Sequence, residues 1–363
     1  MIAIAGHHHS NQVVPLGRML AWFLRIPPDS AASVKLRIPL EVPVVVMRTW
    51  RDEAAVLAAL KGVSPESGFV TPRCLVAFAG ASVHRYEPGT VLSEILGPLG
   101  GDMLRDLAEV FAGTAVVGAD QLPALPVGWP QDHKSSDAFL DYLVHYAEHR
   151  VHRRHRPVFG ALFDGLGIPV DALARFRAKV SSRTPELQRR PYALLHTDLH
   201  RDNIVLLDAG GLFILDWELA TYGDPLHDLA THLVRMRYTD DECERMTHLW
   251  EEALVRQGCS AMTAGLRTDL QAYLDFEYAQ SVYADVVRAA VDLGRRPGCP
   301  RLGPSVARVQ RALTRAEEAI GLTVPSYGEI EVALADWHAL RHPERRRGRT
   351  FRVCAPRKRA AAR

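Results

Sequence analysis

The chain has 363 residues, of which 47% are hydrophobic and 24% charged, and its formal net charge at pH 7 is +2. No apolar run approaches the roughly 18 residues that a membrane-spanning helix needs, so we expect a soluble protein without membrane partners. Five scattered cysteines without a C-x-x-C pair argue against a disulfide framework and a cysteine-based zinc site. The first residues lack the basic leader and apolar stretch of a secretory signal, so we expect a cytoplasmic location.

Charge is distributed unevenly along the chain. Residues 341–363 hold ten Lys/Arg against one Glu, a net charge of +9, which leaves −7 for the rest of a chain whose total is +2. Residues 224–285 carry twelve Asp/Glu against five Arg. We expect 326–363 to form a basic, flexible tail. Because no basic patch with interleaved aromatic residues accompanies this tail, the sequence predicts no specific nucleic-acid partner.

The first part of the chain predicts a small, mostly antiparallel sheet with one helix. Short β-branched runs alternate there with turn residues, which is typical of strands. The expected strands are 12–16, 33–38, 42–47, 74–79 and 82–87, and the expected helix is 51–63. A Pro-Gly turn at Pro88 and Gly89 closes the last strand, so we place the end of an N-terminal lobe, residues 1–89, at this point.

Residues 90–325 are predicted to form a second, mainly helical lobe. The expected helices are 101–117, 136–152, 158–166, 170–182, 225–237, 240–257, 263–293 and 304–319. Two short apolar strands interrupt them between residues 192 and 217, where Asp208, Gly210 and Gly211 supply the tight turn of a hairpin. The predicted fold class is therefore α+β, with two lobes of unequal size.

The loop "HTDLHRDN", residues 196–203, concentrates polar side chains between the apolar segments "ALL" and "IVLL". Asp198 and Asn203 fit the pattern H-x-D-x-x-x-x-N, and Asp216 ends an apolar strand about a dozen residues later. A strand-rich lobe followed by a helical lobe with these residues is the layout of a kinase active site. Phosphoryl transfer requires positioning and charge neutralisation, which carboxylates, an amide and a metal ion can provide.

The two segments "LLHTDLHRDNIVL" and "FILDWELATYGDPLHDLATHL" together resemble the signature of the aminoglycoside phosphotransferase and choline kinase family. This resemblance implies a protein-kinase-like fold with a small antiparallel β N-lobe and a larger helical C-lobe. It also implies that Asp198 orients the acceptor hydroxyl and accepts its proton. Asn203 and Asp216 would hold Mg²⁺, which prefers hard oxygen ligands and would bridge the phosphates of ATP or GTP.

The same resemblance implies a basic residue on an N-lobe strand that binds the α- and β-phosphates, with a helix glutamate holding it. We place the basic residue at Arg48, at the end of the expected strand 42–47, with Glu53 as its partner. Lys35, one strand earlier, is the alternative. Arginine binds phosphate with a different reach from lysine, so this departure from the family pattern bears on nucleotide affinity and choice.

Other positions are expected to support the site. The adenine would lie against Arg85 to Glu87, where extended backbone offers amide and carbonyl groups. His196 is expected to shape the loop by hydrogen bonding rather than to carry protons. Asp224 and Asp228 are expected to cap the following helix and to stabilise the catalytic loop.

The sequence thus predicts a phosphotransferase that moves the γ-phosphoryl group of ATP or GTP to a hydroxyl of a small molecule. The acidic region 224–285 would attract a cationic acceptor such as a cationic antibiotic or another basic natural product. One alternative is a kinase for Ser/Thr of a precursor peptide in ribosomal peptide biosynthesis, for which a partner lyase would be expected. Another alternative is a pseudokinase scaffold. The departure from the family pattern at Arg48 suggests it, but the intact Asp198, Asn203 and Asp216 argue against it.

Overall fold

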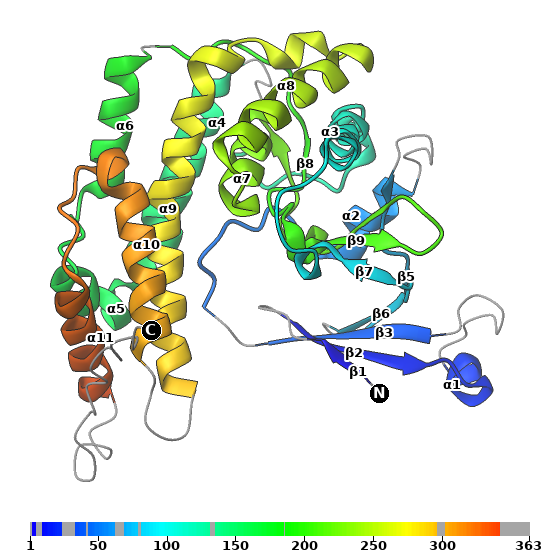
Figure 1. Cartoon of the computed structure of the whole chain (residues 1–363), viewed down its shortest axis with the longest axis horizontal. Coiled ribbons are helices and arrows are strands. Elements are labelled where there is room, and N and C mark those ends of the chain that lie inside the picture. The colour runs from blue at the N-terminus through cyan, green and yellow to red at the C-terminus, as the bar shows by residue number, and fades with distance from the viewer. Residues whose placement is uncertain are drawn as a thin grey trace, which may run out of the picture.

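The computed structural model describes residues 2–4, 9–23, 33–40, 43–61, 69–78, 81–130, 135–184, 186–295 and 302–341. A small sheet-rich N-lobe lies beside a larger helical C-lobe (Figure 1). The C-lobe is built around one large cluster of buried hydrophobic residues, and a second, small cluster around Val34 and Val83 lies in the N-lobe. None of the described helices is long and apolar enough to cross a bilayer.

The N-lobe sheet has five antiparallel strands in the order β1-β2-β3-β6-β5. The strands are β1 Ile2–Ile4, β2 His9–Pro15, β3 Ser33–Pro39, β5 Cys74–Phe78 and β6 Ala81–Arg85. Two helices accompany them, α1 Arg18–Phe23 and α2 Glu53–Leu60. Asp52 caps α2 by accepting a hydrogen bond from the Ala54 amide at 2.9 Å, which fixes the start of the helix and hence the position of Glu53.

Two smaller sheets follow, and the first of them contains strands of both lobes. One has the order β4-β10-β9-β7, with strands β4 Phe69–Val70, β10 Leu212–Ile214, β9 Ile204–Leu207 and β7 Gly89–Val91. The other pairs β8 Ala193–Leu195 with β11 Thr221–Gly223. Strands β9 and β10 form the expected antiparallel hairpin, with positive φ values of 89° and 88° at Gly210 and Gly211 in its turn. Because β7 pairs with β9, the chain joins the sheet of the β9–β10 hairpin at the lobe boundary predicted near residue 89.

The C-lobe is mainly helical, as the sequence predicts. Its helices are α3 Gly101–Ala115, α4 Ser136–Tyr146, α5 Arg153–Gly165, α6 Ala172–Arg183, α7 Pro225–Met236, α8 Asp240–Arg256, α9 Leu266–Arg295, α10 Leu302–Ile320 and α11 Tyr327–Arg341. A π-helical segment, η5 Ala147–His152, connects α4 with α5. Short 3-10 helices are η3 Leu92–Glu94, η4 Ala119–Gln121, η6 Arg201–Asn203, η7 Trp217–Leu219 and η8 Ser260–Thr263.

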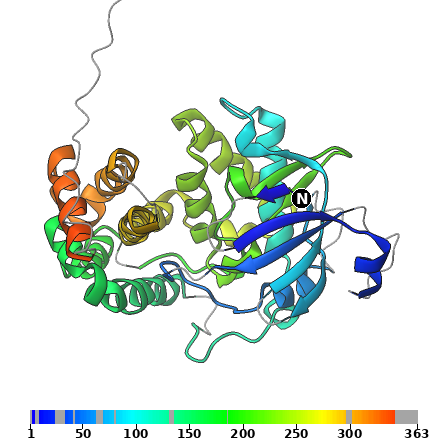
Figure 2. The same ribbon diagram turned by 90° about the horizontal axis from the view of Figure 1, so that it is seen from below.

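The helices divide into two groups in space. Helices α5, α6, α9, α10 and α11 lie on the side away from the N-lobe, whereas α3, α7 and α8 surround the small sheets (Figures 1 and 2). Helix α9 packs against α7 on one side and α10 on the other. It therefore connects the two groups, and its neighbour α7 also contacts β8, the strand before the loop 196–203.

Four expectations from the sequence are wrong. Residues 18–23 form the helix α1, although a single helix was expected in the N-lobe. Residues 43–50 form no strand, although 42–47 were expected to be one. Helix α5 begins at Arg153 and continues through Pro157, so no new helix begins at residue 158. Residues 327–341, expected in the flexible tail, form α11, whose Trp337 stacks on Phe159 with ring centroids 5.3 Å apart. The remainder of the expected tail, 342–363, lies outside the described residues.

Candidate active site

The loop between β8 and β9 contains a strained residue that needs support from outside the loop. Thr197 has a φ of 55°, a left-handed conformation that is unfavourable for a residue with a branched side chain. Asp228 of α7 accepts hydrogen bonds from the amides of His196, at 3.0 Å, and Thr197, at 2.6 Å. Asp224 caps the same helix by accepting from the Leu226 amide at 3.0 Å. The expected roles of Asp224 and Asp228 in capping and loop support are confirmed.

One face of α7 binds the loop at three successive points. Four residues after Asp228, the His232 imidazole donates to the Leu199 carbonyl at 2.8 Å. Three residues further on, Arg235 forms an ion pair with the Asp198 carboxylate. Side chains at i, i+4 and i+7 share one side of a helix, so a single rigid element positions both the backbone and the acidic side chain of the loop.

Asp198 is held by three neighbouring side chains. The Asn203 amide nitrogen donates to the Asp198 carbonyl at 2.9 Å and to Oδ2 of its carboxylate at 3.2 Å. Arg235 contacts the other carboxylate oxygen, Oδ1, and His200 Nε2 lies 3.4 Å from the same atom. Because the amide nitrogen of Asn203 faces Asp198, its amide oxygen is directed away from that carboxylate.

Asp216 lies at the same end of the hairpin as Asn203. The Leu215 amide donates to the Asn203 carbonyl at 2.8 Å, which places the residue after Leu215 next to the catalytic loop. Asp216 itself has a left-handed backbone, with φ 61° and ψ 64°. The structure therefore brings Asn203 and Asp216 together, as expected. Their amide and carboxylate oxygens are ligands that suit Mg²⁺.

Arg37 of β3 connects this end of the hairpin with the N-lobe. Its Nη1 lies 2.6 Å from Oε2 of Glu53, and its Nη2 lies 2.8 Å from Oδ1 of Asp216. Glu53 also accepts a hydrogen bond from the Trp217 amide at 2.9 Å. Burial by itself would lower the pKa of Arg37, but the carboxylates of Glu53 and Asp216 raise it above its ordinary value. The guanidinium is therefore a permanent positive charge at the junction of the lobes.

The expected position of Arg48 is therefore corrected. The glutamate of α2 pairs with Arg37 and not with Arg48, whose Nη2 lies 2.8 Å from Oε2 of Glu218. Arg48 follows a segment that is not a strand, so it does not share a sheet face with the site. Burial, reinforced by the charge of Asp216, raises the pKa of Glu218 to about 8 although Arg48 opposes the shift. The strand position expected for Arg48 is held by Arg37.

Lys35 lies two residues before Arg37 on β3, so both side chains are on the same face of the strand. Burial, together with the charge of Arg37, lowers the pKa of Lys35 to about 8, and Asp216 and Glu53 oppose the shift. These four groups are therefore close enough to influence one another electrostatically. The structure places Lys35, the alternative to Arg48, in the site with Arg37.

The segment expected to bind adenine lies at the end of β6. The Arg85 guanidinium contacts Glu87 at 2.8 Å. The amide of Arg85 donates to the Arg73 carbonyl at 3.0 Å, and that of Tyr86 donates to the Ser33 carbonyl at 3.3 Å. Two of the amides expected to face a nucleobase are thus bonded within the N-lobe. Contact of Arg85 and Glu87 with the nucleotide remains a proposal.

His196 is buried and binds the protein through both ring nitrogens. Nε2 donates to the Leu215 carbonyl at 2.9 Å, and Nδ1 accepts from the Asp198 amide at 3.2 Å. Burial lowers its pKa to about 4, so the ring is neutral at physiological pH. These contacts agree with the expected structural role of His196, because a ring with both nitrogens engaged has none left to exchange protons with a substrate.

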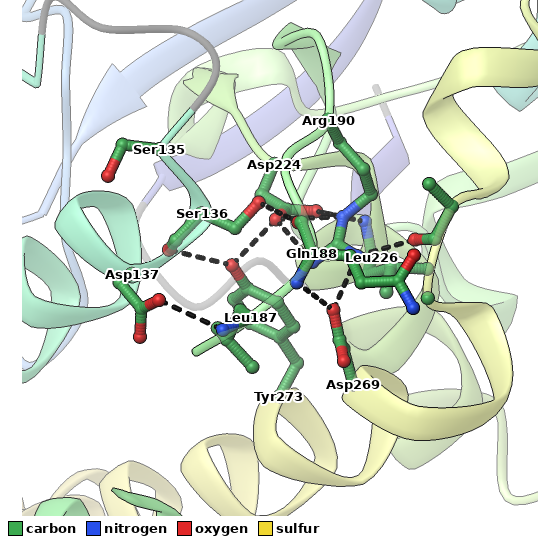
Figure 3. A network of polar contacts seen from close by, with 12 residues as sticks. Ser135, Ser136, Asp137, Leu187, Gln188, Arg190, Asp224, Leu226, Asp269 and Tyr273 are labelled. Carbon is green, nitrogen blue, oxygen red and sulfur yellow. Dashed lines mark hydrogen bonds and ion pairs between the residues drawn. The ribbon is translucent and has the colours of Figure 1, made fainter. Parts of the chain in front are cut away.

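A buried polar network fixes the segment before β8 to helices α7 and α9 (Figure 3). Arg190 is fully buried, and its guanidinium contacts Asp224 at 2.9 Å and Asp269 at 2.7 Å. The Tyr273 hydroxyl donates to Asp224 at 2.9 Å, and the Gln188 amide donates to Asp269 at 2.7 Å. Breaking a buried charge pair is strongly destabilising, so this network holds the catalytic loop and the start of α7 in a fixed relation.

Comparison with known proteins agrees with this geometry. A family model described as "Phosphotransferase enzyme family" (APH) matches residues 6–264, which is more than half of the chain. The chain belongs to this phosphotransferase family. A search of curated proteins gave no match.

Solved structures with the same fold include kinases of small molecules. A choline/ethanolamine kinase family protein from Mesorhizobium loti has a TM-score of 0.52 and 16% identity, covering 92% of this chain and 91% of its own. An ethanolamine kinase from Plasmodium vivax has a TM-score of 0.54 and 13% identity, covering 86% and 81%. A thermostable mutant of an aminoglycoside phosphotransferase, in ternary complex with ADP and hygromycin B, has a TM-score of 0.51 and 14% identity, covering 90% and 94%. The expected family and the two-lobed α+β kinase-like fold are thus confirmed.

Three arginines at or near the candidate site were not expected from the sequence, namely Arg37, Arg235 and Arg190. Two of them leave a recognisable signal. Arg37 and Lys35 alternate on one expected strand, and Arg235 follows Asp228 at the i+7 spacing of a helix face. Arg190 lies in a segment without periodicity, and its partners are distant in the chain, so no local pattern indicates it.

Proposed function

We propose that this phosphotransferase moves the γ-phosphoryl group of ATP, or of GTP, to a hydroxyl group of a small molecule. The observation that supports this most strongly is the convergence of Asp198, Asn203 and Asp216 at one end of the β9–β10 hairpin, with the Arg37–Glu53 pair beside them. These are types of group that a kinase site uses for positioning and charge neutralisation.

In the proposed reaction, the acceptor oxygen attacks the γ-phosphorus while the bond from that phosphorus to the β–γ bridging oxygen breaks. The electron pair of this bond leaves with ADP, and the hydroxyl proton goes to Asp198. Asn203 and Arg235 keep the Asp198 carboxylate in a fixed orientation, which removes the entropic cost of aligning it with the acceptor. Such positioned proton acceptors contribute about 10²–10⁴-fold to rates.

Asn203 and Asp216 would hold Mg²⁺, since their side-chain oxygens are the donors this ion prefers. When bound, the ion would neutralise charge on the nucleotide phosphates. Lys35 and Arg37, on the same face of β3, would add positive charge on the N-lobe side. In this arrangement Arg37 takes the role first expected of Arg48, and Glu53 orients it.

The test is a screen for phosphorylated products by mass spectrometry. Purified protein, magnesium and ATP or GTP are incubated with hydroxyl-bearing small molecules and, separately, with Ser/Thr peptides. The proposal predicts a mass gain corresponding to one added HPO₃ on a small molecule, and its loss in Asp198→Asn. Phosphorylation of peptides alone would favour the precursor-peptide alternative. Nucleotide binding without any transfer would favour the scaffold alternative.

A further inference from the structure

The acidic residues that suggested a cationic acceptor do not converge on Asp198. Six of the twelve between residues 224 and 285 lie on α8, which packs against α3: Asp240, Asp241, Glu242, Glu244, Glu251 and Glu252. Four others have partners elsewhere: Asp224 and Asp269 pair with Arg190, Asp275 pairs with Arg183, and Asp228 binds the loop amides. The remaining two, Glu277 and Asp285, lie on α9 and interact with the arginines Arg235 and Arg288, so ten of the twelve acidic residues are not directed at an acceptor.

Arginine side chains instead lie beside the proposed base. Arg235 forms an ion pair with Asp198, and its other terminal nitrogen lies 3.9 Å from Glu277 of α9. Asp285 and Arg288 follow Glu277 on α9 after eight and eleven residues, which places all three on the same side of the helix. Asp198 and Arg235 both shift the pKa of Arg288, so its guanidinium lies within the electrostatic field of the base.

Arg288 differs from Arg235 and Arg308 in having no close partner among the described residues. Arg235 is engaged by Asp198, and Arg308 of α10 contacts Asp292 at 3.0 Å. Arg288 makes no hydrogen bond or ion pair with any residue that the structure describes, although its side chain is partly buried. Burial, followed by the charge of Arg235, lowers its pKa, and Asp285 opposes this shift. A partly buried guanidinium without hydrogen bonds is unfavourable, and an anionic ligand would relieve this.

We propose that the acceptor carries an oxyanion group, which Arg288 binds while the acceptor hydroxyl lies at Asp198. This inference rests on the proposed function and specifies its substrate class. The planar guanidinium matches the two oxygens of a carboxylate or phosphate, so one group would be fixed by a pair of parallel hydrogen bonds. A polycationic acceptor would meet the like charges of Arg235 and Arg288 at the same place.

The experiment measures anion binding to the nucleotide-loaded protein. Wild type is saturated with magnesium and AMP-PNP, so that added phosphate cannot occupy the nucleotide site, and its thermal unfolding midpoint is followed. Inorganic phosphate, acetate and methylammonium are titrated separately at constant ionic strength. We expect a saturable increase in the midpoint with the anions and none with methylammonium. The anion that binds with the lower Kd shows whether a phosphate or a carboxylate is preferred.

The variants assign the effect to one side chain. In Arg288→Gln the apparent Kd for the anion should rise about tenfold or more, equivalent to about 1.4 kcal/mol. Arg288→Lys keeps the charge without the planar fork and should give an intermediate value. Arg267→Gln, which removes an exposed arginine at the start of the same helix, should match wild type. If Arg288→Gln does not fold, wild type and Arg288→Lys still provide the comparison.

The failures of the two proposals are distinguishable in this assay. If AMP-PNP with magnesium does not stabilise the wild type, the proposed function itself is contradicted. If the nucleotide binds but neither anion does, the oxyanion inference alone is wrong. It is also overturned if Arg288→Gln binds the anion as well as wild type does, or if methylammonium stabilises the protein more than the anions.

Discussion

Removing the side chain of Arg37 should weaken both the folded state and nucleotide binding. Arg37 contacts Glu53 at 2.6 Å and Asp216 at 2.8 Å, and the side chains of Arg37 and Glu53 are only 5% and 12% exposed. Charge-assisted hydrogen bonds contribute about 1.5–3 kcal/mol each, and a buried charge left unpaired costs about 3–5 kcal/mol. Because Asp216 is more exposed, its contact with Arg37 contributes less to stability than the contact with Glu53. We expect Arg37→Ala to lower the free energy of unfolding by about 3 kcal/mol.

Urea denaturation measures the stability change, and equilibrium titration measures the affinity for the magnesium nucleotide. Arg37→Ala should raise the Kd for the nucleotide about tenfold or more, because a phosphate-facing charge is lost and Glu53 and Asp216 lose their common partner. Arg48→Ala is the matched control, since it removes an arginine that pairs with Glu218 instead. If Arg48→Ala weakens the nucleotide while Arg37→Ala leaves it within twofold, the assignment of Arg37 is wrong.

Two further predictions concern the reaction and its pH dependence. Asp198→Asn should lower kcat about 10²-fold or more and leave the nucleotide Kd nearly unchanged, because the carboxylate contacts the acceptor and not the nucleotide. Product assays at fixed times measure kcat, and equilibrium titrations measure the Kd. Turnover close to that of wild type would show that Asp198 is not the proton acceptor. Lys35 has a pKa of about 8, below the ordinary value, so it loses its positive charge as the pH rises through about 8. Nucleotide affinity should therefore fall between pH 7 and 9.5 in wild type and fall less in Lys35→Ala, and equal slopes would show that Lys35 does not contact the phosphates.

The relative position of Asn203 and Asp216 could be predicted from the sequence because local structure determines it. The turn at Gly210 and Gly211 makes a hairpin, and a hairpin necessarily brings the residues before its first strand next to those after its second. Asn203 and Asp216 occupy those two positions. Only short-range geometry was needed to expect them together.

The N-lobe assignment failed because tertiary packing overrode β propensity. The run at Val44, Val45 and Val46 favours a strand by composition, but Val45 and Val46 are both buried, with exposures of 3% and 8%. Neighbouring residues of a strand point to opposite faces, so burial of both residues fits a segment enclosed by other elements better than a half-buried strand. Because that strand is absent, the basic strand residue that pairs with Glu53 is Arg37 of β3.

The end of the C-lobe differs from the expected flexible tail because a helix pattern precedes the basic stretch. Ile330, Leu334 and Trp337 repeat at i, i+4 and i+7, which is a helix pattern, and all three are buried in α11. The Trp337 indole donates to the Val158 carbonyl at 3.0 Å, so α11 is attached to α5. The strongly basic stretch begins only where this helix ends, at Arg341.

The central claim, that Asn203 and Asp216 form the magnesium and nucleotide end of a kinase site, is tested most directly by titrating ATP with and without magnesium. The wild type should bind ATP more tightly when magnesium is present. Asp216→Asn, which removes one negative charge from the hard-cation site, should lose most of this difference. If the variant keeps the same magnesium dependence as wild type, Asp216 is not a metal ligand and the account of the site is contradicted.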